Sequence, residues 1–199
     1  EKQKYKLLLQ KEKNILIKDK QKKQETGIVI KLDISENRAK IAYLSVGSNL
    51  GNKKINIEKI KNYLQNNDLN IVKISKNYET FSWPDKKKPK FINAVLQIKT
   101  TLNAISLLKR CLDIEKKLGR IRGKKNDPRI CDIDIIDYNG EKIELKRKSL
   151  FLPHPEMHKR NFVLLPLYEI NKNWKHPIKK ITIKTLINSL NIEDIRTIK

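Results

Sequence analysis

The chain has 199 residues, of which 38% are hydrophobic, so it can build one modest core and one domain with some residues left over. Its 45 lysines and arginines outnumber 22 aspartates and glutamates. The formal charge of +23 favours anionic ligands such as nucleic acid, phosphorylated substrates or anionic lipid, although lysine-rich compositional drift explains part of it equally well. No apolar run approaches the roughly 18 residues that span a bilayer, and no leader pattern opens the chain. We therefore expect a soluble protein.

The two cysteines, Cys111 and Cys131, are not close enough in sequence to form a metal-binding or redox motif. This cysteine usage is typical of a reducing compartment. We therefore expect the protein in the cytoplasm, or in an organelle of similar redox character.

Residues 1–40 differ in composition from the rest of the chain, because they are rich in lysine and contain one aromatic residue, Tyr5. We interpret them as a basic extension with one or two strands, followed by a folded domain at 41–199. Two origins remain open for the extension, a basic tail and the last elements of an upstream fused domain. The alternating sequence GIVIKLDI favours the second origin slightly.

The first predicted elements of the domain are a strand, a helix and a second strand. The sequence IAYLSVG, residues 41–47, is typical of a strand, and the turn residues after it lead into an amphipathic helix. In that helix Ile57, Ile60 and Leu64 recur at the spacing of one face. Residues 69–80 alternate loosely and predict the next strand.

Residues 91–99 predict a more regular strand, followed by a second helix. Apolar residues at every second position form one face of the strand, and Phe91 and Asn93 point to the other face. Asn103 is a suitable cap for the second helix, which has its own apolar stripe. Gly119 ends this helix.

Residues 130–138 predict a strand in which apolar side chains face one way while Asp132 and Asp134 face the other. The pair Asn139 and Gly140 is a hairpin signal that leads to a short strand near Ile143.

The remaining residues predict a proline-rich turn, an apolar helix at about 161–170 and a last helix near 185–190. The complete order begins strand, helix, strand, strand, helix, strand. This order predicts an α+β fold, an antiparallel sheet with both helices on one face in the ferredoxin-like arrangement.

The strongest chemical signal is the sequence DPRICDIDII. Asp132 and Asp134 lie two residues apart on one strand, so both carboxylates point to the same side. Like charges held this close cost free energy unless a cation neutralises them, and oxygen ligands of this kind suit Mg²⁺. The alternative is an exposed strand with its polar residues turned outward.

A basic loop lies between the second helix and this acidic strand. It contains Arg120, Arg122 and Arg129, with Lys125 among them. The planar guanidinium matches phosphate oxygens, so three arginines beside a metal-binding pair suit a triphosphate. A basic loop is more often solvated than functional, and the position beside the aspartates favours function. Glu115 is predicted to face inward near the end of the helix, either as a structural partner of an arginine or in the chemistry.

Two further groups of side chains are candidates for ligand binding. Phe91 and Asn93 share one face, where a ring and an amide suit a flat, hydrogen-bonding heterocycle; the alternative is a surface aromatic residue with a polar neighbour. The sequence LPHPEMHKRNFVLLPL places His154 between two prolines, close to Arg160 and to Phe162 at the start of the apolar helix. Proline rigidity would orient the imidazole, whereas the alternative is a simple turn.

The motifs FINAV, GRIR, PRxxDIDI and LPHPxMxxRxFVLxPL occur in this order, and over about residues 41–170 the chain resembles the 6-hydroxymethyl-7,8-dihydropterin pyrophosphokinase family of folate biosynthesis. The resemblance implies a ferredoxin-like fold and an ATP-dependent diphosphotransferase that passes the β,γ-diphosphate of ATP to the pterin hydroxymethyl group, leaving AMP.

The same resemblance implies a role for individual residues. Asp132 and Asp134 would hold two Mg²⁺ ions, and Arg120 and Arg129 would be catalytic by stabilising the transferring phosphates. The predicted ATP-binding residues are Glu115, Arg122, Lys125, Ile135, His154 and Arg160. The predicted pterin-binding residues are Thr80, Phe91, Asn93 and Phe162.

Three departures from the family pattern concern the loops. Where the family often has a mobile Arg-Trp-Gly flap, this chain has a shorter segment at 125–127 without the tryptophan, and Trp83 is a candidate substitute. An arginine that often precedes the Leu-x-x-Pro-His stretch is replaced by Ser149, next to Lys148. A Pro-Pro pair after the pterin-side threonine is replaced at 81–82 by Phe-Ser.

Two rival functions come from other classes. A basic sheet-and-two-helix domain can bind RNA on an open sheet, but Asp132 and Asp134 would repel the RNA backbone, and only Phe91 offers a ring for stacking. The other rival is an inactive domain retained for assembly. We expect ATP and the pterin as partners, with covalent fusion to dihydroneopterin aldolase or dihydropteroate synthase as a further option, and neither membrane nor nucleic acid.

Overall fold

The computed structural model describes residues 38–65, 69–82, 85–121, 123, 126–192 and 198. All of them lie within one structural unit, Asn37–Lys199. The predicted extension at 1–40 falls almost entirely outside the described residues, as do Arg122, Lys125 and Trp83. The first elements in chain order are β1 (Lys40–Ser48), α2 (Lys53–Gln65), β2 (Asn70–Ile74), β3 (Tyr78–Thr80), β4 (Phe91–Thr100), α3 (Ala104–Lys117) and β5 (Asp132–Tyr138).

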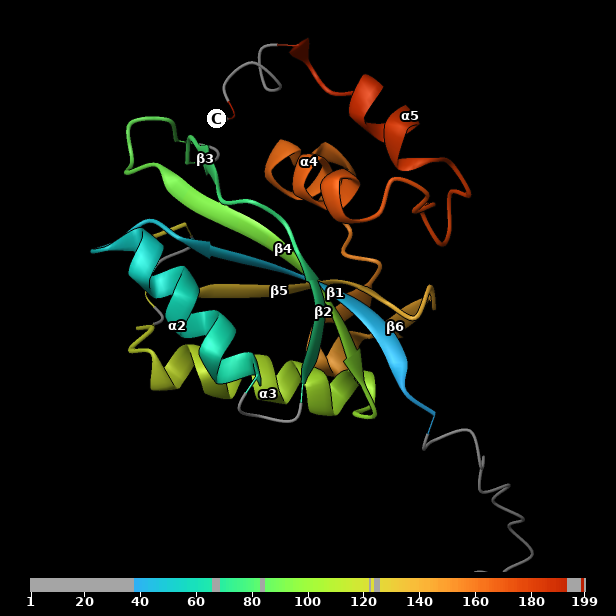
Figure 1. Ribbon diagram of the computed structural model, residues 1–199, viewed down its shortest axis with the longest axis horizontal. Coiled ribbons are helices and arrows are strands. Elements are labelled where there is room, and N and C mark those ends of the chain that lie inside the picture. Colours follow the sequence, from blue (N-terminus) through green and yellow to red (C-terminus); the bar gives the residue numbers. More distant parts are fainter. Residues whose placement is uncertain are drawn as a thin grey trace, which may run out of the picture. The chain divides into compact units, whose positions relative to one another are not determined.

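The main sheet is antiparallel throughout, with the strand order β2-β4-β1-β5 and with β3 also paired to β4 (Figure 1). The α+β fold class is therefore confirmed. The single strand predicted at 69–80 is wrong, since two short strands pair with successive parts of β4. Between them the Ser75 hydroxyl accepts a hydrogen bond from Val95 N at 2.9 Å, which replaces a ladder bond where the chain leaves the sheet.

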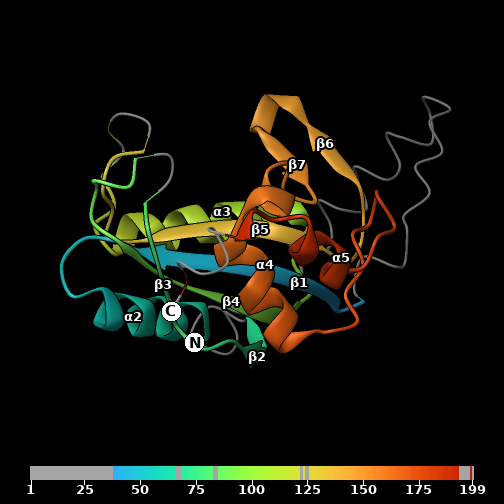
Figure 2. The ribbon, with the colours of Figure 1, turned by 90° about the horizontal axis from the view of Figure 1, so that it is seen from above.

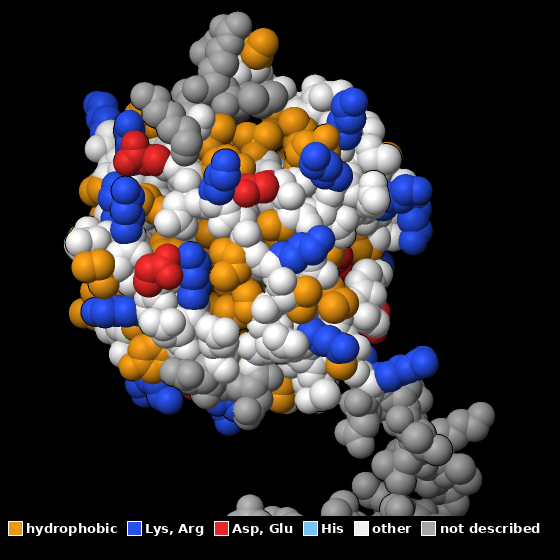
Figure 3. Space-filling model, viewed as in Figure 1, with side chains coloured by type: hydrophobic (Ala, Val, Ile, Leu, Met, Phe, Trp, Pro, Cys, Tyr) orange, Lys and Arg blue, Asp and Glu red, His pale blue; other side chains and the backbone are white. Residues whose placement is uncertain are grey.

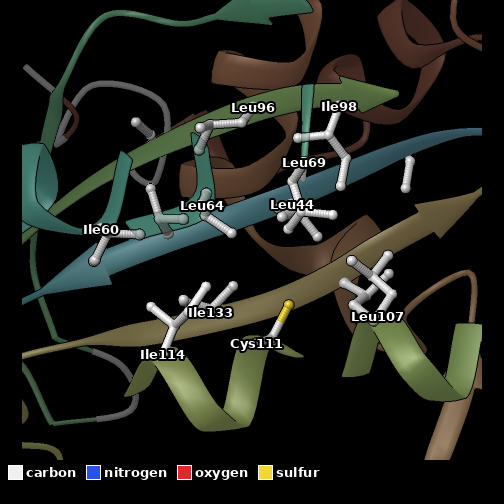
Figure 4. Close-up of a cluster of buried hydrophobic side chains, with 14 of the residues drawn as sticks. Leu44, Ile60, Leu64, Leu69, Leu96, Ile98, Leu107, Cys111, Ile114 and Ile133 are labelled. Atoms are coloured by element: carbon white, nitrogen blue, oxygen red, sulfur yellow. The ribbon is translucent and has the colours of Figure 1, made fainter. Parts of the chain in front are cut away.

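Helices α2 and α3 cover one face of the sheet, as the sequence predicts, and enclose the first hydrophobic core (Figures 1 and 2). Figure 4 shows how Ile60 and Leu64 of α2 and Ile114 of α3 point toward Leu44 and Leu96 on the strands. This packing follows from the helical spacing of the apolar residues and from their alternation along the strands.

The opposite face of the sheet carries a second hydrophobic core that the sequence analysis did not predict. Helices α4 (Asn161–Ile170) and α5 (Ile183–Asn188) lie on this side, and α4 packs on Tyr43, Val95 and Ile136 (Figures 1 and 2). Ile136 lies on this side through the alternation of the strand, on the same face as Asp132 and Asp134. A register shift between Tyr43 and Leu44 then turns Asp137 to this side too, where it accepts a hydrogen bond from Trp174. The face that holds Phe91 and Asn93 is thus open only at its end near the start of β4 and β5.

A small second sheet is formed by β6 (Ile143–Leu145) and β7 (Leu150–Leu152). Asn139 and Gly140 both have positive φ, 54° and 67°, as the predicted two-residue turn requires. The predicted hairpin is nevertheless wrong in its pairing, because β6 pairs with β7. The turn is instead fixed to its own strand by a 3.0 Å hydrogen bond from Gly140 N to the Asp137 carboxylate.

The visible surface carries many basic side chains, as the excess of lysine and arginine in the sequence predicts. In Figure 3 lysine and arginine side chains are distributed over the visible face, and acidic side chains lie beside several of them. Among the described residues, no helix combines the length and the apolar character that crossing a membrane requires.

Candidate active site

A cavity of about 510 Å³ opens at the uncovered end of the second sheet face. Its walls come from the central strands, from the loops before β4 and β5, and from the segment that leads into α4. Ten of the residues predicted for the site line it, namely Thr80, Phe91, Asn93, Arg120, Arg129, Asp132, Asp134, His154, Arg160 and Phe162. The fold therefore brings together the residues predicted for the pterin, the metal and the phosphates.

The sheet register sets the spacing of these groups. On β1, Gly47 lies opposite Asn93 of β4 on one side and opposite Asp132 of β5 on the other. Two residues earlier, Ser45 lies between β4 and Asp134. Neighbouring strands are about 4.8 Å apart, so the amide and the carboxylates are separated by about 10 Å.

Gly47 and Ser45 line the cavity but were not predicted as site residues. A Cβ atom on Gly47 would lie 2.7 Å from Asn93 Oδ1 and 3.4 Å from Phe91 Cδ1, so only glycine fits without a shift of the amide. The signal that could have identified Gly47 is a glycine inside a predicted strand, which often marks close approach by another group.

Arginines and acids form a network around Asp132 and a separate pair at Asp134. Asp132 accepts hydrogen bonds from two arginines, from Arg120 to Oδ1 at 2.5 Å and from Arg129 to Oδ2 at 3.1 Å. Asp134 is paired with Arg160 at 3.3 Å. Such charge-assisted bonds fix the direction of each guanidinium.

Glu115 anchors this network from the side of the helices. Its side chain is buried, 3% of the residue is exposed, and its carboxylate contacts Arg120 and accepts a 2.8 Å hydrogen bond from Ile133 N. The prediction that Glu115 faces inward near the end of the helix is confirmed. These contacts agree with a structural role, one of the two predicted for Glu115, because they hold Arg120 and the start of β5 in place.

The pair Asp132 and Asp134 has the donor set that a hard divalent cation prefers. Burial, with the charge of Asp132 as the second cause, raises the pKa of Asp134 to about 6, and the nearby arginines only partly oppose the rise. A cation between the carboxylates would remove this repulsion. Mg²⁺ is usually bound through one or two carboxylates, substrate phosphates and water, so a pair of carboxylates is a sufficient protein donor set.

His154 is held as a neutral imidazole. Burial is the main cause that lowers the pKa of His154 to about 4, and the charge of Arg160 adds to it. Nδ1 accepts a 3.2 Å hydrogen bond from Glu156 N, so the proton of the neutral ring lies on Nε2. Nε2 can therefore donate a hydrogen bond to a ligand oxygen in the cavity.

Another part of the cavity wall presents two aromatic rings and an amide. The guanidinium of Arg129 lies 5.9 Å from the Phe91 ring, and that of Arg160 lies 5.7 Å from the Phe162 ring. Asn93 donates a 2.8 Å hydrogen bond to the hydroxyl of Thr80, which orients the amide. This wall is suited to a flat polar heterocycle.

A second cavity, of about 600 Å³, adjoins the first on the far side of Arg120 and was not predicted. Arg120 lines both cavities, and Leu108 and Leu112 of α3 give the second one an apolar wall. Glu115, Lys148 and Ser149 also line it. Among the predicted nucleotide contacts, Ile135 lies instead in the first hydrophobic core, so any contact from it would involve the backbone.

Comparison with known proteins identifies the family of this chain. The family model described as 7,8-dihydro-6-hydroxymethylpterin-pyrophosphokinase matches residues 43–172. The folic acid synthesis protein fol1 of Pneumocystis carinii is 36% identical over 78% of this chain and 21% of its own length. The 2-amino-4-hydroxy-6-hydroxymethyldihydropteridine pyrophosphokinase of Aquifex aeolicus is 39% identical over 71% of this chain and 87% of its own length. The chain thus spans about a fifth of the fol1 relative.

Among solved structures, a Plasmodium falciparum HPPK-DHPS variant solved with pteroate superposes with a TM-score of 0.64. It is 19% identical, and the match covers 85% of this chain and 48% of that chain. This likeness supports the fold alone, whereas the family assignment rests on the family model and the sequence relatives. The chain belongs to the 7,8-dihydro-6-hydroxymethylpterin-pyrophosphokinase family.

Proposed function

We propose that this chain transfers diphosphate from ATP to 6-hydroxymethyl-7,8-dihydropterin and releases AMP. The observation that carries the proposal is the cross-strand row Asn93, Gly47 and Asp132, in which the strands of the amide and of the acid are about 10 Å apart. This spacing supports a pterin bound at the amide and a metal ion at the acid. Family membership supports the same reaction.

The pterin would bind against the aromatic wall. Phe91 and Phe162 would contact its ring faces, and Asn93 would bond to its heteroatoms while Thr80 holds the amide in place. Gly47 leaves room between this wall and the acids, so the hydroxymethyl group can reach the phosphate side.

ATP would extend across both cavities. Its phosphates would lie in the first cavity among Arg120, Arg129 and Arg160, with His154 donating to a phosphate oxygen. Because Arg120 also lines the second cavity, the base and ribose would occupy that space against its leucine wall. Arg122 and Lys125 remain proposed contacts to the nucleotide.

Asp132 and Asp134 would hold Mg²⁺, with two ions expected. When bound, Mg²⁺ neutralises charge on the phosphate oxygens and orients them. The pterin hydroxyl oxygen would form a bond to the β-phosphorus as the bond from that phosphorus to the α–β bridging oxygen breaks. AMP would leave with that oxygen, and the hydroxyl proton would pass to water. Arg120 and Arg129 would stabilise the charge that develops, since such transfer depends mainly on positioning and electrostatics.

The test is AMP formation from ATP and Mg²⁺, with and without the pterin. We expect AMP only when the pterin is present, and a loss of turnover in Asp134→Ala with unchanged circular dichroism. Full turnover in that variant would refute the metal assignment. Salt-dependent RNA binding without turnover would favour the RNA alternative, against which the central Asp132 and Asp134 and the cover provided by α4 already argue.

We also propose that residues 41–199 form the catalytic domain and that residues 1–40 are a basic extension, with the end of an upstream fused domain as its favoured origin. The greater length of the fol1 relatives supports fusion to other folate enzymes. Cys111 and Cys131 are free and buried, which supports a reducing compartment such as the cytoplasm.

A further inference from the structure

Asn49, in the turn between β1 and α2, connects this turn to the loop that carries Arg129. Its backbone N donates a 3.1 Å hydrogen bond to Arg129 O, and its side-chain Oδ1 accepts a 2.7 Å hydrogen bond from Arg129 N. Asn49 is 3% exposed, so water competes little for these bonds. Together they fix the backbone of Arg129 in two directions.

The other end of the same amide holds the loop that leads into β4. Nδ2 of Asn49 donates to Pro89 O at 3.2 Å and to the Ser82 hydroxyl at 3.4 Å. Ser82 in turn donates to Pro89 O at 2.5 Å. An amide is required here, because one end faces an N–H group and the other a carbonyl; a carboxylate matches only the first and a hydrocarbon matches neither.

The two loops that Asn49 joins carry groups on opposite sides of the cavity. Pro89 is two residues before Phe91, and the guanidinium of Arg129 lies 5.9 Å from the Phe91 ring and 3.1 Å from Asp132. A second link between the loops is the 2.8 Å hydrogen bond from Lys88 Nζ to Asn126 O. Asn49 therefore determines the separation of the Phe91 ring from Arg129 at the acid pair.

We propose that Asn49 is a positioning residue for diphosphate transfer, which keeps Arg129 aligned with the pterin wall. This inference rests on the proposed function. Of the three arginines proposed to contact ATP, Arg120 is held by Glu115 and Asp132, and Arg160 is held by Asp134. Of these three, only Arg129 depends on the Asn49 amide. Loss of the amide should impair pterin use much more than ATP binding.

The test compares Asn49→Ala with Asn56→Ala as a matched control. The Asn56 amide, in the first part of α2, donates to the Ser48 hydroxyl at 3.0 Å and to Leu50 O at 2.9 Å, so these bonds reach neither of the two loops that Asn49 joins. In Asn49→Ala we expect kcat/KM for the pterin to fall by about 100-fold, the cost of a misplacement of about 1 Å, with the KM for ATP changed by less than about threefold. Asn56→Ala should leave both parameters near those of the wild type.

The variant Asn49→Asp and hydrogen exchange at Arg129 N test the role of Asn49 separately from the proposed activity. Asn49→Asp retains the acceptor for Arg129 N but loses the donor to Pro89 O, so it should show the same selective loss. Hydrogen exchange at Arg129 N should accelerate in Asn49→Ala and not in Asn56→Ala, whether or not the protein forms AMP. Three results would overturn the role of Asn49. They are an effect on ATP as large as the effect on the pterin, an equal fall of kcat/KM for the pterin in Asn49→Ala and Asn56→Ala, and unchanged hydrogen exchange at Arg129 N in Asn49→Ala. A wild-type protein that forms no AMP would refute the function instead.

Discussion

Replacing Asp134 with asparagine should stabilise the Mg²⁺-free protein while it removes activity. The rise in the pKa of Asp134 from 3.8 to about 6 corresponds to about 3 kcal/mol at 1.36 kcal/mol for each tenfold change. The Asp134 side chain is 39% exposed, so solvent screening reduces this cost to about 1 kcal/mol. Asparagine keeps the shape of the side chain and removes the charge that Asp132 repels.

The pH dependence of this gain has a defined sign. The pKa is higher in the folded protein than in the unfolded chain, so the ionised carboxylate lowers the free energy of unfolding above about pH 6. The cost disappears as the pH falls through 6 toward 4, where Asp134 becomes protonated in the folded state. Asp134→Asn should therefore gain about 1 kcal/mol over the wild type at pH 8 and nothing near pH 4.

The assay is urea unfolding at pH 4, 6 and 8 with a chelator, repeated at pH 8 with Mg²⁺. Glu58→Gln, at a surface ion pair with Lys61 on α2, is the control and should change the free energy of unfolding by less than about 0.5 kcal/mol. Mg²⁺ should stabilise the wild type and have little effect on Asp134→Asn. A variant that is less stable than the wild type at pH 8, or equally stabilised at pH 4 and 8, would refute the reasoning.

Three further changes test other parts of the site and fold. Gly47→Ala should raise the KM for the pterin about tenfold and leave that for ATP unchanged, since its Cβ would displace Asn93; equal rises would contradict this. His154→Gln should keep activity within about tenfold and His154→Leu should not, because the pKa of His154 is about 4 and its neutral ring would act as a hydrogen-bond donor. Trp174→Phe should lower the free energy of unfolding by about 1–3 kcal/mol in urea, with kcat little changed, because it removes the 2.7 Å bond to buried Asp137.

The faces of β4 and β5 were predictable because strand side chains alternate with a period of two. This alternation predicted Phe91 and Asn93 on the face of β4 that points away from the first core. It predicted Asp132 and Asp134 on the corresponding face of β5. Helical spacing likewise placed Glu115 inward. Each of these predictions needs only residues within a few positions of one another.

The second core could not be predicted in the same way. It depends on the packing of α4 against side chains from three different strands, Tyr43, Val95 and Ile136, and on a register shift between Tyr43 and Leu44 that turns Asp137 toward it. The pairing of β6 with β7 is a similar case, because the signal at 139–140 specifies a turn but not the strand that follows it.

The contacts between the loops around the cavity were the least predictable from the sequence. They include the loop with the segment at 125–127, where the chain departs from the family pattern. Asn49 appears in the sequence as an ordinary turn residue, and its partners lie 33, 40 and 80 positions away. Three of these bonds end on backbone atoms, so they do not require a particular side chain in the partner loops. The link from Lys88 to Asn126 O also ends on the backbone. Among the described residues, the backbone of Arg129 is bonded to Asn49 in the turn between β1 and α2, and these bonds do not require a tryptophan in the segment at 125–127.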